Sequence, residues 1–158
     1  MGYIIRGANI PGTGTNISNP NYLSVTADME SAVWNAATTQ EVFTVTGLVR
    51  ARFWIECTET VESGGAATIQ FGVEGVTNGF IASTTATELA AGDLWYDASP
   101  ATVYDTAANA IMDYVINGLD VGYEIGTAAL TNGTLVFHCV WEPLNPTGNV
   151  AAGAGGAL

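Results

Sequence analysis

The sequence predicts an all-β protein, an antiparallel β-sandwich of about eight strands with a jelly-roll-like arrangement. Two observations lead to this fold class. Runs of alternating apolar and polar residues recur at intervals of about ten residues, and 19 of the 158 residues are glycine, which suits many tight turns. No repeat of about 20 to 50 residues is visible, so a solenoid or propeller is not expected. A chain of this length can bury one core.

Composition divides the chain into three parts. Residues 1–21 are rich in Gly, Asn and Pro and predict an irregular N-terminal arm of the kind that reaches a neighbour. Residues 22–146 hold the alternating runs and form the sandwich domain. Residues 147–158 are mostly Ala and Gly and bury too little apolar surface to become ordered alone, so a flexible tail is expected there.

The first half of the domain is led by one long strand. Residues 22–27 predict a strand, and Asp28 is placed to cap one or two helical turns through Ala37. Residues 41–46 alternate up to a glycine, and residues 48–61 then alternate over more than one dozen positions, which predicts the strand that anchors the fold.

Shorter strands are expected after it. Residues 67–75 have the same alternation and predict a hairpin partner for the long strand. Residues 94–97 predict a short strand. Residues 110–116 favour a strand, although a helix capped by Asp105 remains an alternative.

A hairpin signal precedes the last long strand. The pair Asn132-Gly133 predicts a tight turn, because both central positions of the favoured hairpin turn need residues that tolerate positive φ. The strongly alternating residues 134–142 should then form a central strand.

The negative net charge excludes some classes of binding partner. Arg6, Arg50 and Arg52 are the only basic residues besides one histidine, no lysine occurs, and fifteen carboxylates give a net charge of −12. Binding to nucleic acid or to an anionic membrane needs clustered basic residues, so neither partner is expected. The low charged fraction and a mean hydropathy of +0.28 suggest that other chains cover part of the surface. The alternative is a monomer kept apart by its negative field.

Targeting and membrane signals are also missing from the pattern. The apolar run near the N-terminus is too short for a signal peptide, and no stretch reaches the roughly 18 apolar residues of a membrane helix. Nothing in the pattern therefore directs the chain to export.

Few residues could perform catalysis or hold a cofactor. His138 is the only histidine, and without lysine neither a phosphate-binding loop with its lysine nor a Schiff base can form. Glu56 and Glu59 alternate to opposite faces of one strand, which does not suit a glycosidase pair. Asp93 and Asp97 could contribute oxygen ligands to calcium, but the usual loop spacing is absent. We therefore expect no enzyme, no catalytic residue, no cofactor and no metal.

The two cysteines do not make a disulfide framework. Cys57 and Cys139 each lie on the apolar side of a predicted strand, which favours buried free thiols. A disulfide between neighbouring strands is the alternative.

Four residues on the long strand form the candidate interface. Alternation places Arg50, Arg52, Trp54 and Glu56 on the face opposite the apolar residues of that strand. Arginine and tryptophan are enriched where protein interfaces concentrate binding energy, because a guanidinium can pair with a carboxylate and stack on an aromatic ring. This face is predicted to contact a neighbouring subunit. The alternative is that both arginines pair with acids on adjacent strands of the same chain.

Several short sequences resemble small virion proteins of tailed bacteriophages. They are EVFTVTG at 41–47 followed by the long strand, GAATIQFGVEG at 65–75, AAGDLWYD at 90–97, and GTLVFHCVWEPL at 133–144 with its Ala/Gly tail. The resemblance covers most of residues 41–158. It implies a capsid decoration, cement or head-fibre protein, located on the virion surface after synthesis in the host cytoplasm, with no catalytic residues.

The same resemblance implies the partners. Such proteins bind the major capsid protein and further copies of themselves, frequently as trimers, and bridge neighbouring capsomers. One alternative is a tail or fibre module whose aromatic residues Trp95, Tyr96 and Tyr104 stack on host sugars, and another is a shell-forming capsid protein. An exposed aromatic groove would favour the sugar-binding alternative.

Overall fold

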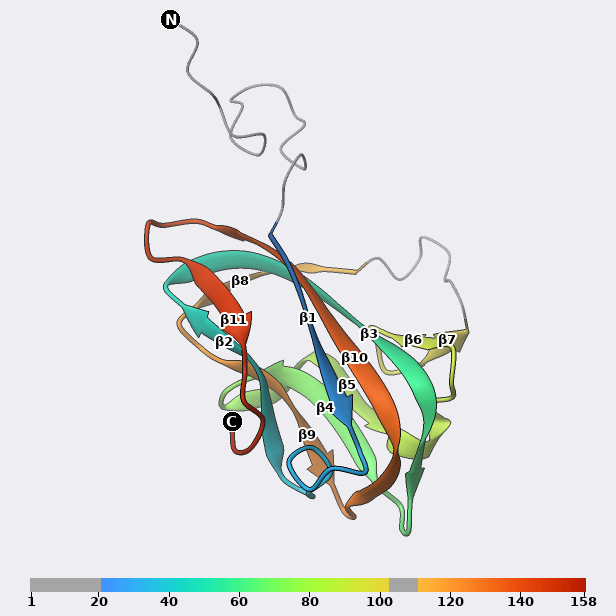
Figure 1. Cartoon of the computed structure of the whole chain (residues 1–158). Coiled ribbons are helices and arrows are strands. Elements are labelled where there is room, and N and C mark those ends of the chain that lie inside the picture. The colour runs from blue at the N-terminus through green and yellow to red at the C-terminus, as the bar shows by residue number, and fades with distance from the viewer. Residues whose placement is uncertain (1–20, 103–110) are drawn as a thin grey trace, which may run out of the picture.

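The computed structural model describes residues 21–102 and 111–158, and these form two antiparallel sheets packed as a β-sandwich (Figure 1). The all-β prediction is therefore confirmed. More strands are present than the eight expected, because several are short. They are β1 (Asn21–Asp28), β2 (Thr39–Thr46), β3 (Leu48–Ser63), β4 (Thr68–Val73), β5 (Val76–Thr85), β6 (Asp93–Trp95), β7 (Ala101–Thr102), β8 (Asp113–Asn117), β9 (Val121–Gly126), β10 (Leu130–Pro143) and β11 (Asn149–Ala152).

Sheet A has the order β1-β10-β3-β6-β7, and β8 also pairs with β3. Sheet B has the order β11-β2-β9-β4-β5. The long strands β3 and β10 lie side by side along sheet A, which confirms that the last long strand is central (Figure 1). Residues 113–117 confirm the strand predicted before the last turn. Residues 1–20 of the predicted arm, and the earlier part of the Asp105 alternative, lie outside the described residues.

The core lies between the sheets because β3 and β10 alternate without interruption over most of their length. Phe53 is 5% exposed, and its ring centroid lies 5.7 Å from that of Phe43, 5.6 Å from Phe71 and 5.2 Å from Phe80. Burial of a side chain of this kind contributes roughly 1.5–3 kcal/mol. The aromatic cluster thus joins β3 of sheet A to three strands of sheet B. No helix in the described part of the chain is long and apolar enough to cross a membrane.

The pairing of β4 differs from the one expected. The segment predicted as a hairpin partner of the long strand forms β4, which pairs with β5 and β9 in the other sheet. A tight hairpin would have kept β4 in sheet A, whereas the chain from Gly64 to Ala67 crosses to sheet B, where Ile69 and Phe71 become fully buried. β4 follows β3 in the sequence but does not pair with it, because in the second sheet Ile69 and Phe71 can both be buried.

The Asn132-Gly133 pair is not a hairpin turn but lies inside β10, where the pairing with β3 shifts register. Gly133 has φ 118°, and a Cβ there would lie 2.8 Å from the Cα of Val61. The glycine therefore permits a bulge against β3. The chain reverses earlier, around Thr127, whose φ is 72°.

The helical turns expected after Asp28 are absent, and the segment is a series of turns. The Asp28 carboxylate does accept a hydrogen bond from the Glu30 amide at 2.8 Å, but no helix continues from it. Met29 is fully buried and Trp34 packs against the core, so these apolar side chains reach the core from turns without a helix, while Val33 is left 47% exposed.

The expected flexible tail is instead an ordered edge of sheet B. Strand β11 pairs with β2, the Gly153 amide donates to the Val42 carbonyl at 2.8 Å, and the Glu41 amide donates to the Gly156 carbonyl at 2.9 Å. These backbone hydrogen bonds do not depend on large side chains. A Cβ on Gly153 would lie 2.9 Å from the Val42 backbone, so the small residues allow this close approach.

Candidate interaction face

The four predicted interface residues share the outer face of sheet A. Along β3, Val49, Ala51, Phe53, Ile55 and Cys57 are buried, and the residues between them point away from the core. Strand β10 lies on one side of β3, while β6 and β8 lie on the other. The face is therefore built from β3 and these three strands, with β1 completing it beyond β10.

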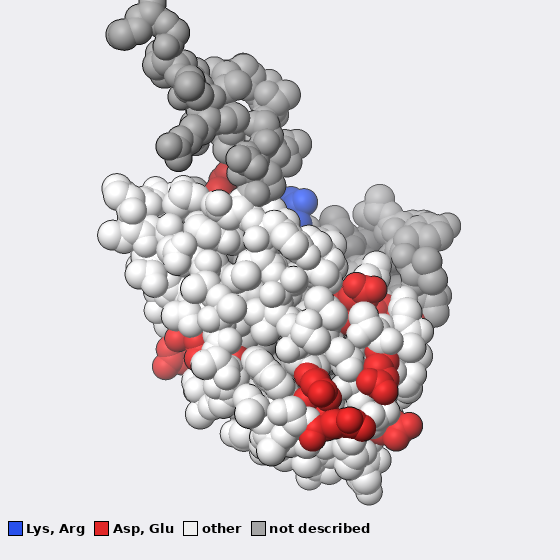
Figure 2. Space-filling model, in the orientation of Figure 1, with Lys and Arg blue, Asp and Glu red and all other residues white. Residues whose placement is uncertain are grey.

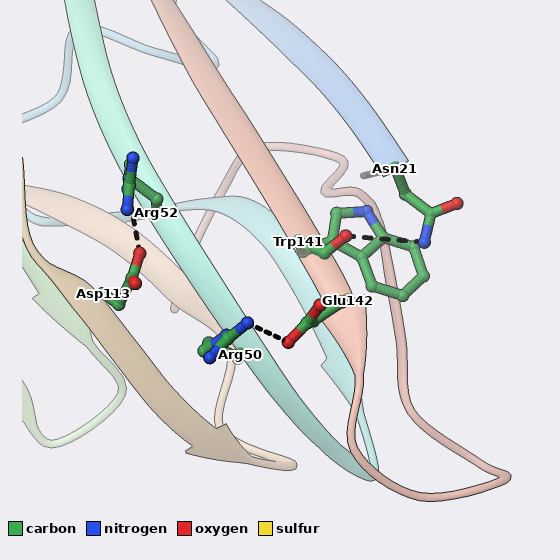
Figure 3. A network of polar contacts seen from close by, with 6 residues as sticks. All are labelled: Asn21, Arg50, Arg52, Asp113, Trp141 and Glu142. Atoms are coloured by element: carbon green, nitrogen blue, oxygen red, sulfur yellow. Dashed lines mark hydrogen bonds and ion pairs between the residues drawn. The ribbon is translucent and has the colours of Figure 1, made fainter. Parts of the chain in front are cut away.

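Both arginines form ion pairs within the chain, as Figure 3 shows. Arg50 Nη2 lies 2.5 Å from Glu142 Oε1 on β10, and Arg52 Nε donates to Asp113 Oδ1 on β8 at 2.8 Å. The hydrogen bond from Arg52 is the main reason that the pKa of Asp113 lies below its ordinary value. The structure thus has the intrachain pairing that the sequence left open as the alternative. Each arginine side chain is about half exposed, so a pair of this kind contributes only about 0–1 kcal/mol to stability.

An aromatic stack occupies the middle of the same face. The ring of Trp54 lies 5.0 Å from that of His138, nearly parallel at 9°, and the ring of Tyr22 lies 6.0 Å from His138 and 6.5 Å from Trp54, so each of the three rings is close to the other two. The strand pairing brings these residues together. Trp54 of β3 lies directly opposite His138 of β10, and Tyr22 of β1 lies opposite Val140, the next outward residue of β10, and so diagonal to His138. The stack links three strands across the outer surface.

Hydrogen bonding orients His138 inside this stack. The Tyr22 hydroxyl lies 2.8 Å from His138 Nδ1, and Glu56 Oε2 lies 3.6 Å from Nε2. The His138 side chain is only 13% exposed. Burial lowers its pKa, while the nearby Glu56 carboxylate opposes that shift. The structure thus favours the neutral form of His138 more than water does, next to the rings of Tyr22 and Trp54.

Exposed apolar side chains border the arginines. Val115 on β8 is 65% exposed and lies opposite Arg50 in the β3–β8 register, and Met112, just before β8, is 64% exposed. Tyr22 is 57% exposed at the other edge of the face. The face thus combines aromatic, aliphatic and paired charged groups, which is the composition typical of protein interfaces.

The remaining sequence candidates do not assemble into a reactive site in the described ranges. No three His, Cys, Asp or Glu side chains there come together as a metal ion would require. Asp93 Oδ2 accepts from the Ala90 amide at 3.0 Å, and Asp97 Oδ1 accepts from the Ser99 amide at 2.7 Å, so both stabilise turns. Glu56 and Glu59 are both exposed on β3, and the Glu59 carboxylate accepts a hydrogen bond from the Thr134 hydroxyl at 3.0 Å.

The cysteines are free and buried, as the sequence favoured. Burial is the main cause that raises the pKa of Cys57 to about 11 and that of Cys139 to about 12. Thiols with such pKa values remain protonated at neutral pH and react slowly.

Trp95, one of the three aromatic residues of the sugar-binding alternative, is not part of an exposed groove. Its side chain is fully buried, and its indole N–H donates to the Thr84 hydroxyl at 3.1 Å. Tyr104 lies outside the described residues.

Sequence reasoning missed three contributors to the face from β1 and β10, namely Tyr22, His138 and Glu142. Alternation in β1 and β10 placed each on one side of its strand, but only the strand pairing brings them beside Trp54 and Arg50. Comparisons with family models, with curated proteins and with solved structures found no match to this chain.

Proposed function

We propose that this chain is a non-enzymatic structural protein of a tailed-bacteriophage virion, a decoration or cement protein that binds the exterior of the capsid and stabilises it. Its partners in this proposal are the major capsid protein and further copies of itself. The observation that carries the proposal is the outer face of sheet A, where exposed Tyr22 and Val115 flank the paired Arg50 and Arg52. Such a face is suited to adhesion through a broad, shallow contact.

The order of the strands supports a jelly roll. With β6, β7 and β8 counted as one strand position and β11 left aside, eight positions remain, and the two sheets read 1-8-3-6 and 2-7-4-5. That order is the one found in jelly rolls, which occur in viral capsid proteins and in lectins. The fold alone does not choose between these two functions.

The distribution of charge favours a protein partner that carries basic residues. Figure 2 shows one side of the molecule with a largely uncharged surface, acidic side chains toward its lower part and a small basic patch near its upper edge. A net charge of −12 repels phosphate backbones and anionic lipid. The same charge attracts a shell surface that exposes lysine or arginine and speeds the first encounter with it.

The sugar-binding alternative loses one of its three aromatic residues, because the buried Trp95 cannot stack on a ligand. The shell-forming alternative differs from the proposal in copy number, because a shell protein would equal or exceed every other capsid component in amount.

Purified virus particles from the source of this gene would test the proposal. We expect mass spectrometry to detect the chain in intact particles, in a fixed ratio to the major capsid protein, and immunogold labelling to place it on the head. Particles assembled without it should release their DNA at a lower temperature than complete particles. Absence from purified particles would refute the virion role, and labelling confined to the tail would favour the sugar-binding module.

A further inference from the structure

Strand β8 presents an open edge on sheet A. Of the strands in residues 21–102 and 111–158, only β3 pairs with β8. The two most exposed of the large hydrophobic side chains in those ranges, Val115 and Met112, lie in β8 or directly before it. Open edges with β-branched residues readily add another strand unless charged residues, above all lysine, or proline or a bulge prevent it. β8 contains no lysine, proline or bulge, and its one charged residue, Asp113, is paired with Arg52.

The hydrogen-bond pattern shows which backbone groups of β8 point outward. The Gly118 amide donates to the Gly47 carbonyl at 2.9 Å, one step beyond the register pair Leu48–Asn117. Hydrogen-bonded pairs alternate along an antiparallel ladder, so Ile116 and Tyr114 bond to β3. Asp113, Val115 and Asn117 therefore direct their N–H and C=O groups away from β3.

Hydrogen bonds on the other side of β3 lead to the same alternation. The Leu144 amide donates to the Leu48 carbonyl at 2.9 Å, so the backbone groups of Leu48 point toward β10 and not toward β8. The hydrogen bonds on both sides of β3 therefore indicate that the backbone groups of Asp113, Val115 and Asn117 have no partner strand in the described part of sheet A.

These outward groups are self-complementary. We propose that two copies of this chain pair edge to edge through antiparallel β8 strands, with a two-fold axis at Val115, and that their sheets A become one continuous sheet. In this register Val115 faces Val115 of the second copy, and Asp113 faces Asn117. All three outward positions then form hydrogen-bonded pairs, and no two carboxylates lie directly opposite each other.

Charge favours this edge over the rest of the surface. Two chains of net charge −12 repel each other. Arg50 and Arg52, the two cations in the described part of the chain, lie on the strand next to β8 and pair with Glu142 and Asp113. The local charge around the proposed axis is therefore balanced, and the repulsion between copies is smallest there. The inference rests on the proposed function, which it deepens by naming the contact between copies.

Light scattering on the full chain tests the pairing. We expect the wild type to have twice the monomer mass of 16.3 kDa. Val115→Asp should lower the mass to that of the monomer, because it places two carboxylates across the axis. Val76→Asp is the matched control, because Val76 is 53% exposed at the start of another edge strand, β5, and its variant should keep the wild-type mass.

Cross-linking gives an independent readout. Facing residues of a hydrogen-bonded pair have Cα atoms about 5.5 Å apart, within the range that a disulfide spans. Val115→Cys should form a covalent dimer on mild oxidation, visible on a non-reducing gel, while Val76→Cys should not. Cys57 and Cys139 are buried and should not interfere.

A wild-type mass of one or three chains, or equal cross-linking of the two cysteine variants, would overturn the pairing. The virion role is decided separately, by whether purified particles contain the chain.

Discussion

The two faces of sheet A are built from alternate residues of the same strands, yet they interact in different ways. On the inner face, Phe53 is packed among aromatic rings from both sheets. On the outer face, its neighbour Trp54 stacks on His138, and the two arginines that precede Trp54 on this face form exposed ion pairs. The inner face stabilises the fold through burial, whereas the outer face contributes little to stability and is available for a partner.

The largest expected effect is on the inner face. Phe53→Ala should lower the free energy of unfolding by about 3–5 kcal/mol, because it removes a buried ring and leaves a cavity between the sheets. Urea denaturation measures this loss. A loss under about 1 kcal/mol would show that the inner face does not carry the stability assigned to it.

A smaller effect is expected at the adjacent position on the outer face. Trp54→Ala should cost about 1–2 kcal/mol, from the ring stack with His138 and the partial burial of the indole. The same urea titration compares the two variants directly. A cost equal to that of Phe53→Ala would mean that the outer face is in fact part of the core.

Removal of an ion pair should cost less still. Arg52→Ala should lower the free energy of unfolding by only about 0.2–1 kcal/mol, because the Arg52–Asp113 pair is about half exposed to water. Added salt screens this pair, so it should change the stability of the variant less than that of the wild type. A loss of several kcal/mol would contradict the assignment of this pair to a solvated surface.

The smallest effect concerns the pH dependence of stability. The folded protein lowers the pKa of His138 below 6.5, so the unfolded chain binds the proton more readily. Wild-type stability should be complete above pH 6.5 and fall as the pH drops through that value toward the folded pKa. His138→Gln should lack this fall between pH 7.5 and 5.5 in thermal denaturation. Because His138 is the only histidine, an identical fall in the variant would assign the effect to another group.

The sequence predicted the orientation of residues better than the pairing of strands. Alternation correctly placed Arg50 and Trp54 outside and Phe53 inside, because side chains in a strand alternate whatever its neighbours are. It did not reveal that β4 joins the other sheet, nor that Gly133 forms a bulge within β10. Those outcomes depend on contacts between residues far apart in the chain.

The candidate face shows the same division. Arg50, Arg52, Trp54 and Glu56 were found because they share one strand. Tyr22 and His138 join them only through the pairing of β1 and β10 with β3. The tail was mispredicted for a related reason, since its order comes from backbone hydrogen bonds to β2 that no side-chain pattern records.

Copies of this chain are proposed to meet through sheet A, at the β8 edge and the outer-face arginines beside it. Light scattering of the full-length wild type beside an Arg50→Ala/Arg52→Ala variant, with circular dichroism to verify that both are folded, tests it most directly. The account predicts a wild-type assembly and a folded variant of lower mass, because the loss of both arginines leaves Glu142 and Asp113 unbalanced between the copies. A wild-type monomer of 16.3 kDa, or a variant that keeps the wild-type mass, would contradict it.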